Sequence, residues 1–350
     1  MRIEEFPLPH LGPGELLVEV ECCTLCRSDL HSFCGNRATP LPTILGHEIL
    51  GHISEMPQNV QIRDGRGEML SVGDRVTWSI AAHCGTCIFC RRGLPQKCEQ
   101  LFKYGHQAID SQHPLSGGLA EYCHLTQQTT VFRLPDEIPM QVLAPANCAT
   151  ATAHAALSAA GDCSEKVVLI FGAGMLGLTA TAMARAGGAR AVLVADVDPQ
   201  RLQRAEQFQA DAAILVAEGS SSLEEVVDRQ TQGRGVDIVL EMSGATKAVE
   251  QAIELLGIGG TCVLVGSVFP ATAARISAER IVRNLITLRG VHNYAPENLA
   301  AAIEFLSQSW QQYPFERLVG PQFSLQDTQA AFEAAANSGA LRVAVTPTRA

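Results

Sequence analysis

The sequence predicts an α/β protein of two domains, a β-rich N-terminal domain and a doubly wound domain built on a parallel sheet. Before about residue 140 the strand signals are short and are separated by glycine, proline and cysteine loops, a texture typical of an irregular barrel. After residue 149, apolar strands alternate with helices, which places a parallel sheet between two layers of helices. The chain has 350 residues, more than one typical hydrophobic core requires.

In the N-terminal domain, strands are predicted from short runs of apolar residues, which in one case alternate with acidic residues. Residues 15–23 alternate partly between apolar and acidic side chains after a glycine–proline turn, which predicts a half-buried strand. We expect three further strands, at 49–53, 75–79 and 120–125.

In the second domain the predicted elements alternate. They are helices at 149–160, 199–208, 223–231 and 245–256, and strands at 166–171, 192–195, 213–215, 236–241 and 261–265. Beyond residue 292 we expect a helix at 296–308, a linking stretch, a helix at 325–337 and a strand at 341–346, packed back onto the first domain. The predicted domains are therefore 1–149 with 293–350, and 150–292.

Composition excludes several classes of partner and compartment. The formal net charge of −10 and the lack of a basic block argue against nucleic acid. Acidic residues stand where a signal peptide needs an apolar core, so we expect a cytoplasmic protein with reduced cysteines. Residues 167–184 carry no charge, but their three glycines fit a buried strand, turn and helix better than a membrane span.

Four cysteines with C-x2-C-x2-C-x7-C spacing predict a zinc site: Cys84, Cys87, Cys90 and Cys98. Short turns bring such thiols to within about 2.3 Å of one tetrahedral ion. The alternative is a set of disulfides, but C-x2-C bridges are strained and the compartment is expected to be reducing. A site of four sulfurs leaves no open position, so this zinc is predicted to be structural.

A glycine-rich turn follows the predicted strand at 166–171 and opens a helix. This context indicates a Rossmann dinucleotide site, with the diphosphate at the helix N-terminus. Asp196, at the end of the next strand, would accept hydrogen bonds from ribose hydroxyls and repel a 2′-phosphate, which favours NAD over NADP. Arg201 could modify that preference or contact the ribose edge of NAD. The alternative is a glycine turn beside an incidental aspartate. The turn consists of Gly172, Ala173, Gly174, Met175, Leu176 and Gly177.

Three ligand-like residues lie outside the four-cysteine loop: Cys26, His47 and Cys148. Read singly, each has a plausible structural role, since a lone cysteine is usually a small buried hydrophobe and a lone histidine a hydrogen-bonded core residue. Read together, two thiolates and one imidazole leave a fourth position open on zinc, which is the arrangement of a catalytic site.

These motifs together resemble those of the zinc-containing medium-chain alcohol dehydrogenases, over nearly the whole chain and in the same order. The resemblance implies a GroES-like barrel with a Rossmann domain, two zinc ions per chain, NAD, and an alcohol that is converted to an aldehyde or ketone. It rests on Cys26-Arg27-Ser28-Asp29-x-His31, Gly46-His47-Glu48, the four-cysteine loop, Cys148-x-x-x-Thr152 and the glycine turn.

The resemblance also implies residue roles. Cys26, His47 and Cys148 would bind catalytic zinc, with Glu48 as a transient ligand and Asp29 accepting a hydrogen bond from the His47 ring. Polyol and threonine dehydrogenase relatives offer glutamate where Cys148 or Asn147 falls, but Thr152 favours Cys148.

The proton and cofactor roles follow in the same way. Ser28 would take the alcohol proton and His31 would pass it to solvent through the cofactor ribose. Arg27 would face the pyrophosphate, and Val265-Gly266-Ser267 would hold the nicotinamide amide. A homodimer or homotetramer is expected, through edge strands near residues 263–268.

A second resemblance concerns the substrate. The segment Phe102-Lys103-Tyr104-Gly105-His106 resembles a bacterial subgroup proposed to act beside phosphonate-degrading enzymes, which implies an anionic head group received by Lys103, His106 or Arg37. The alternative is a solvated loop lysine and a turn histidine. Two other functions stay open: a zinc-dependent lyase or epimerase that retains NAD, and a non-catalytic binding relative.

Overall fold

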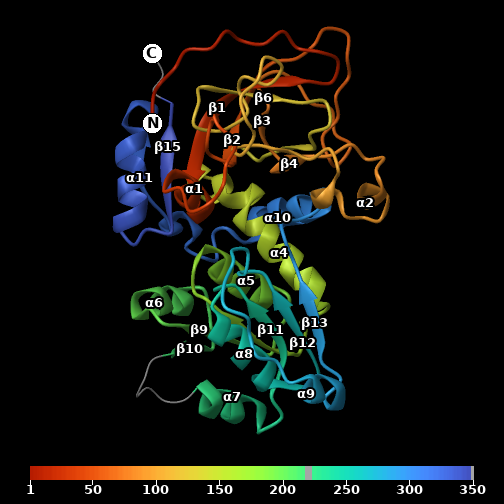
Figure 1. Cartoon of the computed structure of the whole chain (residues 1–350), viewed down its shortest axis with the longest axis vertical. Coiled ribbons are helices and arrows are strands. Elements are labelled where there is room, and N and C mark those ends of the chain that lie inside the picture. The colour runs from red at the N-terminus through yellow and green to blue at the C-terminus, as the bar shows by residue number, and fades with distance from the viewer. Residues whose placement is uncertain (217–222, 348–350) are drawn as a thin grey trace. The chain divides into compact units, whose positions relative to one another are not determined.

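The computed structural model describes residues 1–216 and 223–347. The chain divides into two compact units (Figure 1): Met1–Cys148 with Ala295–Ala350, and Ala149–Tyr294. In the described residues, no helix is both long and apolar enough to cross a bilayer.

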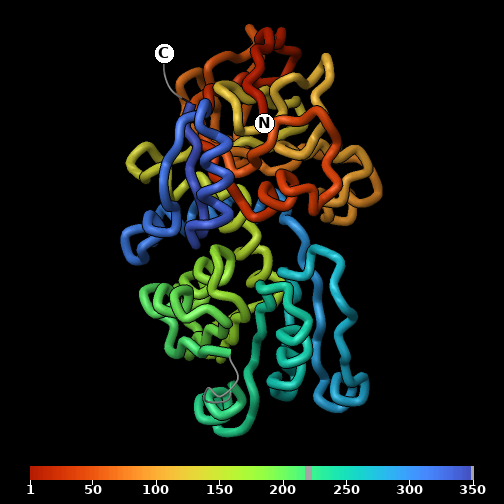
Figure 2. Tube along the Cα trace, turned by 60° about the vertical axis from the view of Figure 1, so that its left-hand side comes forward, coloured from red at the N-terminus to blue at the C-terminus, as the bar shows by residue number. Residues whose placement is uncertain are grey.

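The first unit is built on a seven-stranded sheet in the order β14-β15-β1-β2-β3-β7, with β6 also paired to β1. The C-terminal strand β15 lies antiparallel to β1, with Val345 opposite Cys23, so two strands from opposite ends of the sequence share one sheet. Figure 2 shows the red trace of the N-terminal part and the blue trace of the C-terminal part side by side. A separate two-stranded sheet joins β4 and β5. The bounds are β1 (Leu16–Leu25), β2 (Glu48–Glu55), β3 (Arg75–Trp78), β4 (Ala81–Ala82), β5 (Phe102–Lys103), β6 (Tyr122–Leu125), β7 (Val131–Arg133), β14 (Val319–Ser324) and β15 (Arg342–Thr346).

The first unit also contains α-helices of 4 to 14 residues and several 3-10 turns. The predicted helix at 325–337 is split, because a 3-10 turn precedes α11, and Phe332 of α11 stacks on Phe33 of α1 with ring centroids 4.5 Å apart. The prediction missed α1 and placed only a linking stretch where β14 lies. The helices are α1 (Arg27–Phe33), α2 (Ile88–Arg91), α3 (Met140–Leu143), α10 (Pro296–Ser309), α11 (Thr328–Asn337), and the 3-10 turns η1 (Pro95–Lys97), η2 (Ala144–Asn147), η3 (Phe315–Leu318) and η4 (Leu325–Asp327).

The second unit is a six-stranded parallel sheet in the order β10-β9-β8-β11-β12-β13. The central strand β8 is apolar and buried along its whole length, because helices cover both faces of the sheet. The bounds are β8 (Val167–Phe171), β9 (Ala191–Asp196), β10 (Ala212–Leu215), β11 (Val236–Glu241), β12 (Leu256–Leu264) and β13 (Thr287–Gly290), with helices α4 (Ala149–Ala160), α5 (Met175–Ala186), α6 (Pro199–Gln207), α7 (Leu223–Thr231), α8 (Thr246–Leu255) and α9 (Ala278–Arg283). The predicted α/β class, with a doubly wound domain, is confirmed.

The outer strand of this sheet was not predicted. Strand β12 lies between β11 and β13, and Val263 is buried. The expected edge near residues 263–268 is therefore wrong: in the described part of the chain the sheet ends at β13, whose four residues are all exposed. An exposed strand shows no alternation of apolar and polar residues, which is why the sequence pattern did not indicate it.

Candidate metal centres and dinucleotide site

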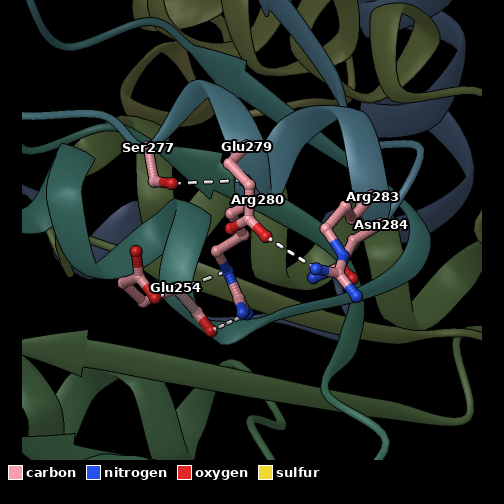
Figure 3. A pocket seen from close by; sticks show the side chains of 6 residues that line it. All are labelled: Glu254, Ser277, Glu279, Arg280, Arg283 and Asn284. Atoms are coloured by element: carbon pink, nitrogen blue, oxygen red, sulfur yellow. Dashed lines mark hydrogen bonds and ion pairs between the residues drawn. The ribbon is translucent and has the colours of Figure 1, made fainter.

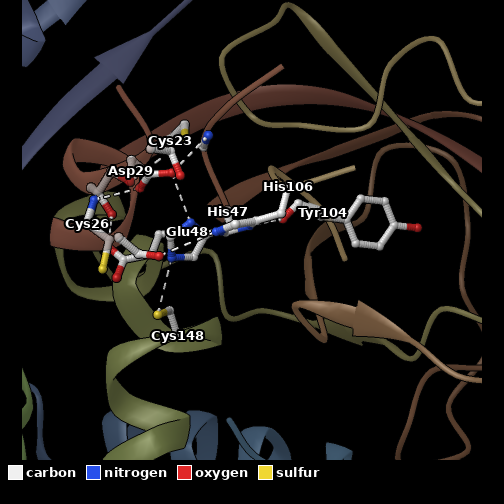
Figure 4. A network of polar contacts seen from close by, with 12 residues as sticks. Cys23, Cys26, Asp29, His47, Glu48, Tyr104, His106 and Cys148 are labelled. Carbon is white, nitrogen blue, oxygen red and sulfur yellow. Dashed lines mark hydrogen bonds and ion pairs between the residues drawn. The ribbon is translucent and has the colours of Figure 1, made fainter. Parts of the chain in front are cut away.

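Four ligand-type residues of the first unit converge on one point: Cys26, His47, Glu48 and Cys148. Their ligand atoms all lie within 4.8 Å of one another (Figure 4). Cys26 caps the N-terminus of α1 directly after β1, His47 stands immediately before β2, and Cys148 follows η2. The antiparallel pairing of β1 with β2 brings Cys26 and His47 together although they stand 21 positions apart in the sequence.

Asp29 fixes the His47 ring. This fully buried carboxylate accepts hydrogen bonds from the backbone N–H of Cys26 (2.9 Å) and of Gly46 (3.2 Å). It also lies 3.0 Å from His47 Nδ1. That bond assigns the proton of the neutral ring to Nδ1 and leaves Nε2 as the free electron pair, as a metal-binding histidine requires. The predicted partnership of Asp29 with His47 is present in the structure.

The segment before Cys148 is fixed to the sheet. The Asn147 side-chain amide donates to the carbonyl oxygens of His47 (3.0 Å) and Trp78 (3.1 Å). Cys148 Sγ then faces His47 Nε2 at 3.5 Å. Of the two neighbouring positions that the sequence left open, the structure therefore turns Cys148, and not Asn147, toward the cluster.

Glu48 has partners that the sequence did not indicate. Arg342 Nε donates to one of its carboxylate oxygens (2.6 Å) and Arg342 Nη2 to the other (2.7 Å), while Thr24 adds a third bond. Arg342 Nη2 also lies 3.6 Å from Cys26 Sγ. Burial raises the pKa of Glu48, and the guanidinium opposes that rise. Glu48 is thus held as one half of a buried ion pair at the edge of the cluster.

The charges of the cluster suit a cation. A hydrogen bond from the Cys148 thiol holds the pKa of Cys26 well below its ordinary value, against the effect of burial. Burial alone would lower the pKa of His47, but the Asp29 carboxylate and the Cys26 sulfur raise it to about 10. A negative field strong enough to attract a proton there would equally attract a divalent ion. Two cysteines and one histidine form a donor set that fits zinc and leaves one position open.

The four-cysteine loop forms a second cluster, with its ligand atoms also within 4.8 Å of one another. Backbone N–H groups point at the sulfurs, from Cys84 to Cys98 Sγ (3.3 Å) and from Cys87 to Cys84 Sγ (3.4 Å). The N–H groups of Thr86 and Cys87 lower the pKa of Cys84 to about 6. All twelve cysteines are free thiols, which disfavours the disulfide alternative, and four sulfurs with no open position fit a closed structural zinc site.

Beside the first cluster, Ser28 joins a network that includes Arg37 and His106. Arg37 Nη1 donates to Ser28 Oγ (2.6 Å) and to His106 Nε2 (3.0 Å). His106 Nε2 is therefore an acceptor, and its Nδ1 donates to the Tyr104 carbonyl (3.1 Å). Burial, the neighbouring His47 and Lys103 lower the pKa of His106 to about 2, so the ring is neutral.

Gly105 permits this contact. Its φ is +73°, and a Cβ atom there would lie 2.5 Å from the Gly46 carbonyl oxygen and 3.0 Å from His47 Cβ. Only glycine lets the turn at Tyr104–His106 approach the metal-ligand segment so closely. The His106 and His47 rings are consequently 5.0 Å apart between centroids.

The second unit holds the glycine turn. Gly174 caps α5, so the backbone N–H groups of Met175 and Leu176 lie in the first turn of that helix. A Cβ atom on Gly177 would lie 1.7 Å from the Gly172 carbonyl oxygen, which explains the third glycine of the motif. One Asp196 oxygen accepts from the backbone N–H of Ala173 (2.6 Å).

The other predicted cofactor residues fall into two groups. Arg201 lies beside Asp196 and residues 265–267 follow β12, whereas Arg27 lies on α1 of the first unit. The other Asp196 oxygen accepts from the backbone N–H of Asp198 (2.9 Å), and Arg201 Nη1 lies 4.0 Å from Asp196. Lone pairs remain on both carboxylate oxygens for ribose hydroxyls. The N–H groups of Val265 and Gly266 both donate to the Glu241 carbonyl, which places Ser267 just past the end of β12. Arg27 is an exposed residue of α1, and His31 is half-buried in the same helix.

Comparison with known proteins decides the family. The pattern of the "Alcohol dehydrogenase GroES-like domain" matches residues 12–136, and that of the "Zinc-binding dehydrogenase" family matches residues 176–308. Sorbitol dehydrogenase of Bacillus subtilis is 30% identical over 356 aligned positions, which cover 100% of this chain and 95% of that protein. The chain belongs to the zinc-containing medium-chain alcohol dehydrogenase family.

Other members of this dehydrogenase family are similar over most of their length. L-threonine 3-dehydrogenase of Pyrococcus abyssi is 34% identical, over 83% of this chain and 79% of that protein. The crystal structure of an alcohol dehydrogenase from Thermotoga maritima superposes with a TM-score of 0.92 at 31% identity, over 99% of this chain and 95% of that one. The predicted family, its oxidoreductase class and its GroES-like domain are confirmed.

In this dehydrogenase the sequence did not predict the roles of two site residues, Arg342 and Asn147. Arg342 gave no local signal, because an arginine in a C-terminal strand is ordinarily a surface residue. Asn147 was considered only as an alternative ligand, whereas its amide anchors the backbone on either side of the cluster.

Proposed function

We propose that this chain catalyses reversible hydride transfer from a primary or secondary alcohol to NAD. The observation that carries the proposal is the convergence of Cys26, His47 and Cys148, a donor set with one position left for a substrate. Zinc held there would act as a Lewis acid and lower the pKa of the alcohol, and a bound nicotinamide would accept the hydride.

The chain's own residues would orient the reactants and move the proton. Asp29 keeps His47 Nε2 turned toward the thiols. Ser28 lies two residues after Cys26, and its oxygen accepts one bond from Arg37, which leaves its second lone pair to receive the alcohol proton and its own hydroxyl proton to be passed on. In this proposal Ser28 takes the alcohol proton and His31 passes it toward solvent.

The cofactor preference rests on Asp196. Its carboxylate is held by the N–H groups of Ala173 and Asp198, so it lies at the turn of the glycine motif. A 2′-phosphate beside it would meet a negative charge, which supports NAD over NADP. Arg201 lies 3.4 Å from Asp198 and would soften that discrimination rather than reverse it.

A panel of alcohols, assayed with NAD and with NADP and with zinc counted per chain, tests the proposal. The panel should contain polyols and hydroxy amino acids, because relatives are named sorbitol and threonine dehydrogenases. We expect NADH formation with two zinc ions per chain. Binding of substrate without net NADH release would contradict the proposal and point to a lyase or epimerase.

A variant separates the zinc site from the fold. Cys148→Ala should abolish alcohol oxidation and leave one zinc ion per chain, while Cys34→Ala, which removes an exposed thiol, should change neither. Full activity with two zinc ions in Cys148→Ala would refute the assignment of Cys148.

A further inference from the structure

Two cations next to the open metal cluster lack a carboxylate partner. Arg37 and Lys103 are both half-buried. Within the described residues, neither forms an ion pair with an acidic side chain, although eight arginines elsewhere in the chain do. Burying a charge without a counter-ion is unfavourable, so two such charges side by side call for an anion.

The other charged groups around the cluster are matched. Glu48 is paired with Arg342. Asp29 receives two backbone N–H groups and the His47 ring. Two thiolates balance the double charge of one zinc ion. None of these anions is therefore left over to neutralise Arg37 and Lys103.

A surface hollow in the second unit provides the contrast. It is lined by Glu254, Ser277, Glu279, Arg280, Arg283 and Asn284 (Figure 3). There Arg280 lies 3.4 Å from Glu254 and Arg283 lies 3.1 Å from Glu279. The cations of that hollow are neutralised by the chain itself, so it lacks the charge imbalance found beside the metal cluster.

The His106 ring lies between Arg37 and the predicted metal ligand His47. Arg37 Nη1 is 3.0 Å from His106 Nε2, and the His106 ring is 5.0 Å from that of His47. The backbone N–H of Arg37 donates to the His31 carbonyl at the end of α1, which anchors the residue to the same helix that carries Ser28. Lys103 lies near enough to Arg37 for the two charges to repel each other, since burial and then Arg37 lower the pKa of Lys103.

We propose that Arg37 and Lys103 form a subsite for an anionic substituent of the alcohol, a carboxylate, phosphate or phosphonate carried within a few bonds of the hydroxyl group. This inference rests on the proposed function and names the substrate class of that site. The planar guanidinium supplies directed hydrogen bonds and the ammonium supplies a point charge. His106 is neutral and serves as an acceptor that orients Arg37, and is not itself a cation for the substrate.

The test compares alcohols of matched length on the zinc-loaded full chain. 2-Hydroxyethylphosphonate and 3-hydroxypropanoate are compared with 1-propanol through kcat/KM for NAD reduction. We expect the wild type to favour the anionic alcohols by at least roughly tenfold, because charge-assisted hydrogen bonds contribute that much. Arg37→Met and Lys103→Met should each reduce the ratio of anionic to neutral alcohol roughly 10- to 100-fold, and Arg37→Lys should restore part of it. Arg229→Met, which removes an exposed cation on α7, should leave the ratio unchanged.

Calorimetric titration measures anion binding at the proposed subsite independently of catalytic turnover. Methylphosphonate, acetate and inorganic phosphate should bind the wild type and lose affinity in Arg37→Met. If no alcohol reduces NAD, the proposed function fails, and these titrations alone decide the anion subsite. An anionic-to-neutral ratio near one in the wild type, or phosphate binding without any preference among alcohols, would overturn the substrate subsite.

Discussion

Arg342, in the C-terminal strand β15, binds both carboxylate oxygens of Glu48, a residue 294 positions earlier in the chain. The arginine side chain is 4% exposed and the glutamate 0%. The pair links the C-terminal strand β15 to the metal-ligand segment, because Glu48 directly follows His47. Its burial means that neither charge can turn to water if the other is removed.

Arg342→Met should therefore destabilise the first unit. Removal of one partner of a buried ion pair costs about 3–5 kcal/mol, because the remaining charge is uncompensated. The double variant Arg342→Met with Glu48→Gln removes both charges and should recover much of that loss. Thermal unfolding of the zinc-loaded protein measures both effects. Equal unfolding temperatures for the single and double variants would show that the arginine acts through packing and not through its charge.

Asp29→Asn should weaken the binding of zinc at the catalytic cluster without unfolding the chain. The amide can keep the backbone bonds only in part and no longer fixes the proton on His47 Nδ1. Loss of such an orienting carboxylate lowers metal affinity by about 10- to 100-fold. Competition with a chromogenic chelator measures the affinity. The matched control is Asp110→Asn, since Asp110 also lies against a histidine, His113, but at an exposed site away from both clusters. An unchanged zinc affinity in Asp29→Asn would contradict the role given to this residue.

Loss of the four-cysteine zinc site should lower the stability of the protein without directly abolishing alcohol oxidation. Cys98→Ser removes a sulfur that accepts the N–H groups of Cys84 and Gln100. We expect one zinc ion per chain, a lower unfolding temperature, and alcohol oxidation that persists at first but decays faster on warming. Metal analysis with timed activity assays checks this. Cys163→Ser, in the second unit and outside both clusters, should keep two zinc ions. Immediate loss of all activity in Cys98→Ser would indicate that this loop takes part in catalysis.

Much of the fold could be predicted because its signals are local. Helix α4 and strand β11 begin and end where their patterns predict, since composition and periodicity alone mark them. Strand β14 contains Gly320 and Pro321, which argue against a strand, and it forms only through parallel pairing with β15. The site divides in the same way. The four-cysteine loop is legible within fifteen residues, whereas Cys26, His47 and Cys148 are spread over more than a hundred residues and no local spacing joins them. Arg342 could not be found at all, because an ion pair between distant strands leaves no trace in either segment.

The free edge of the second unit's sheet predicts self-association. Strand β13 ends the sheet in the described part of the chain, and Val282, Leu285 and Ile258 nearby are 72%, 71% and 80% exposed. An unpaired edge with exposed apolar residues favours pairing with a second copy across a two-fold axis. We expect light scattering to show a dimer or tetramer for the wild type and a shift toward monomer when Leu285→Glu is combined with Val282→Glu. A monomeric wild type would contradict the expectation, and Val72→Glu, an exposed apolar residue of the first unit, is the control.

The remaining thiols should differ sharply in reactivity, because only the thiolate reacts. Burial raises the pKa of Cys22 to about 12, and it raises those of Cys23 and Cys123 as well. At pH 8 a thiol of pKa 12 is ionised to about one part in ten thousand. Cys34 is exposed. Brief iodoacetamide treatment of the zinc-loaded protein at pH 8, followed by peptide mass analysis, should thus label Cys34 and leave the buried three unmodified until the chain is unfolded. Labelling of Cys22 at a rate near that of Cys34 would mean that the first sheet opens to solvent in the native protein.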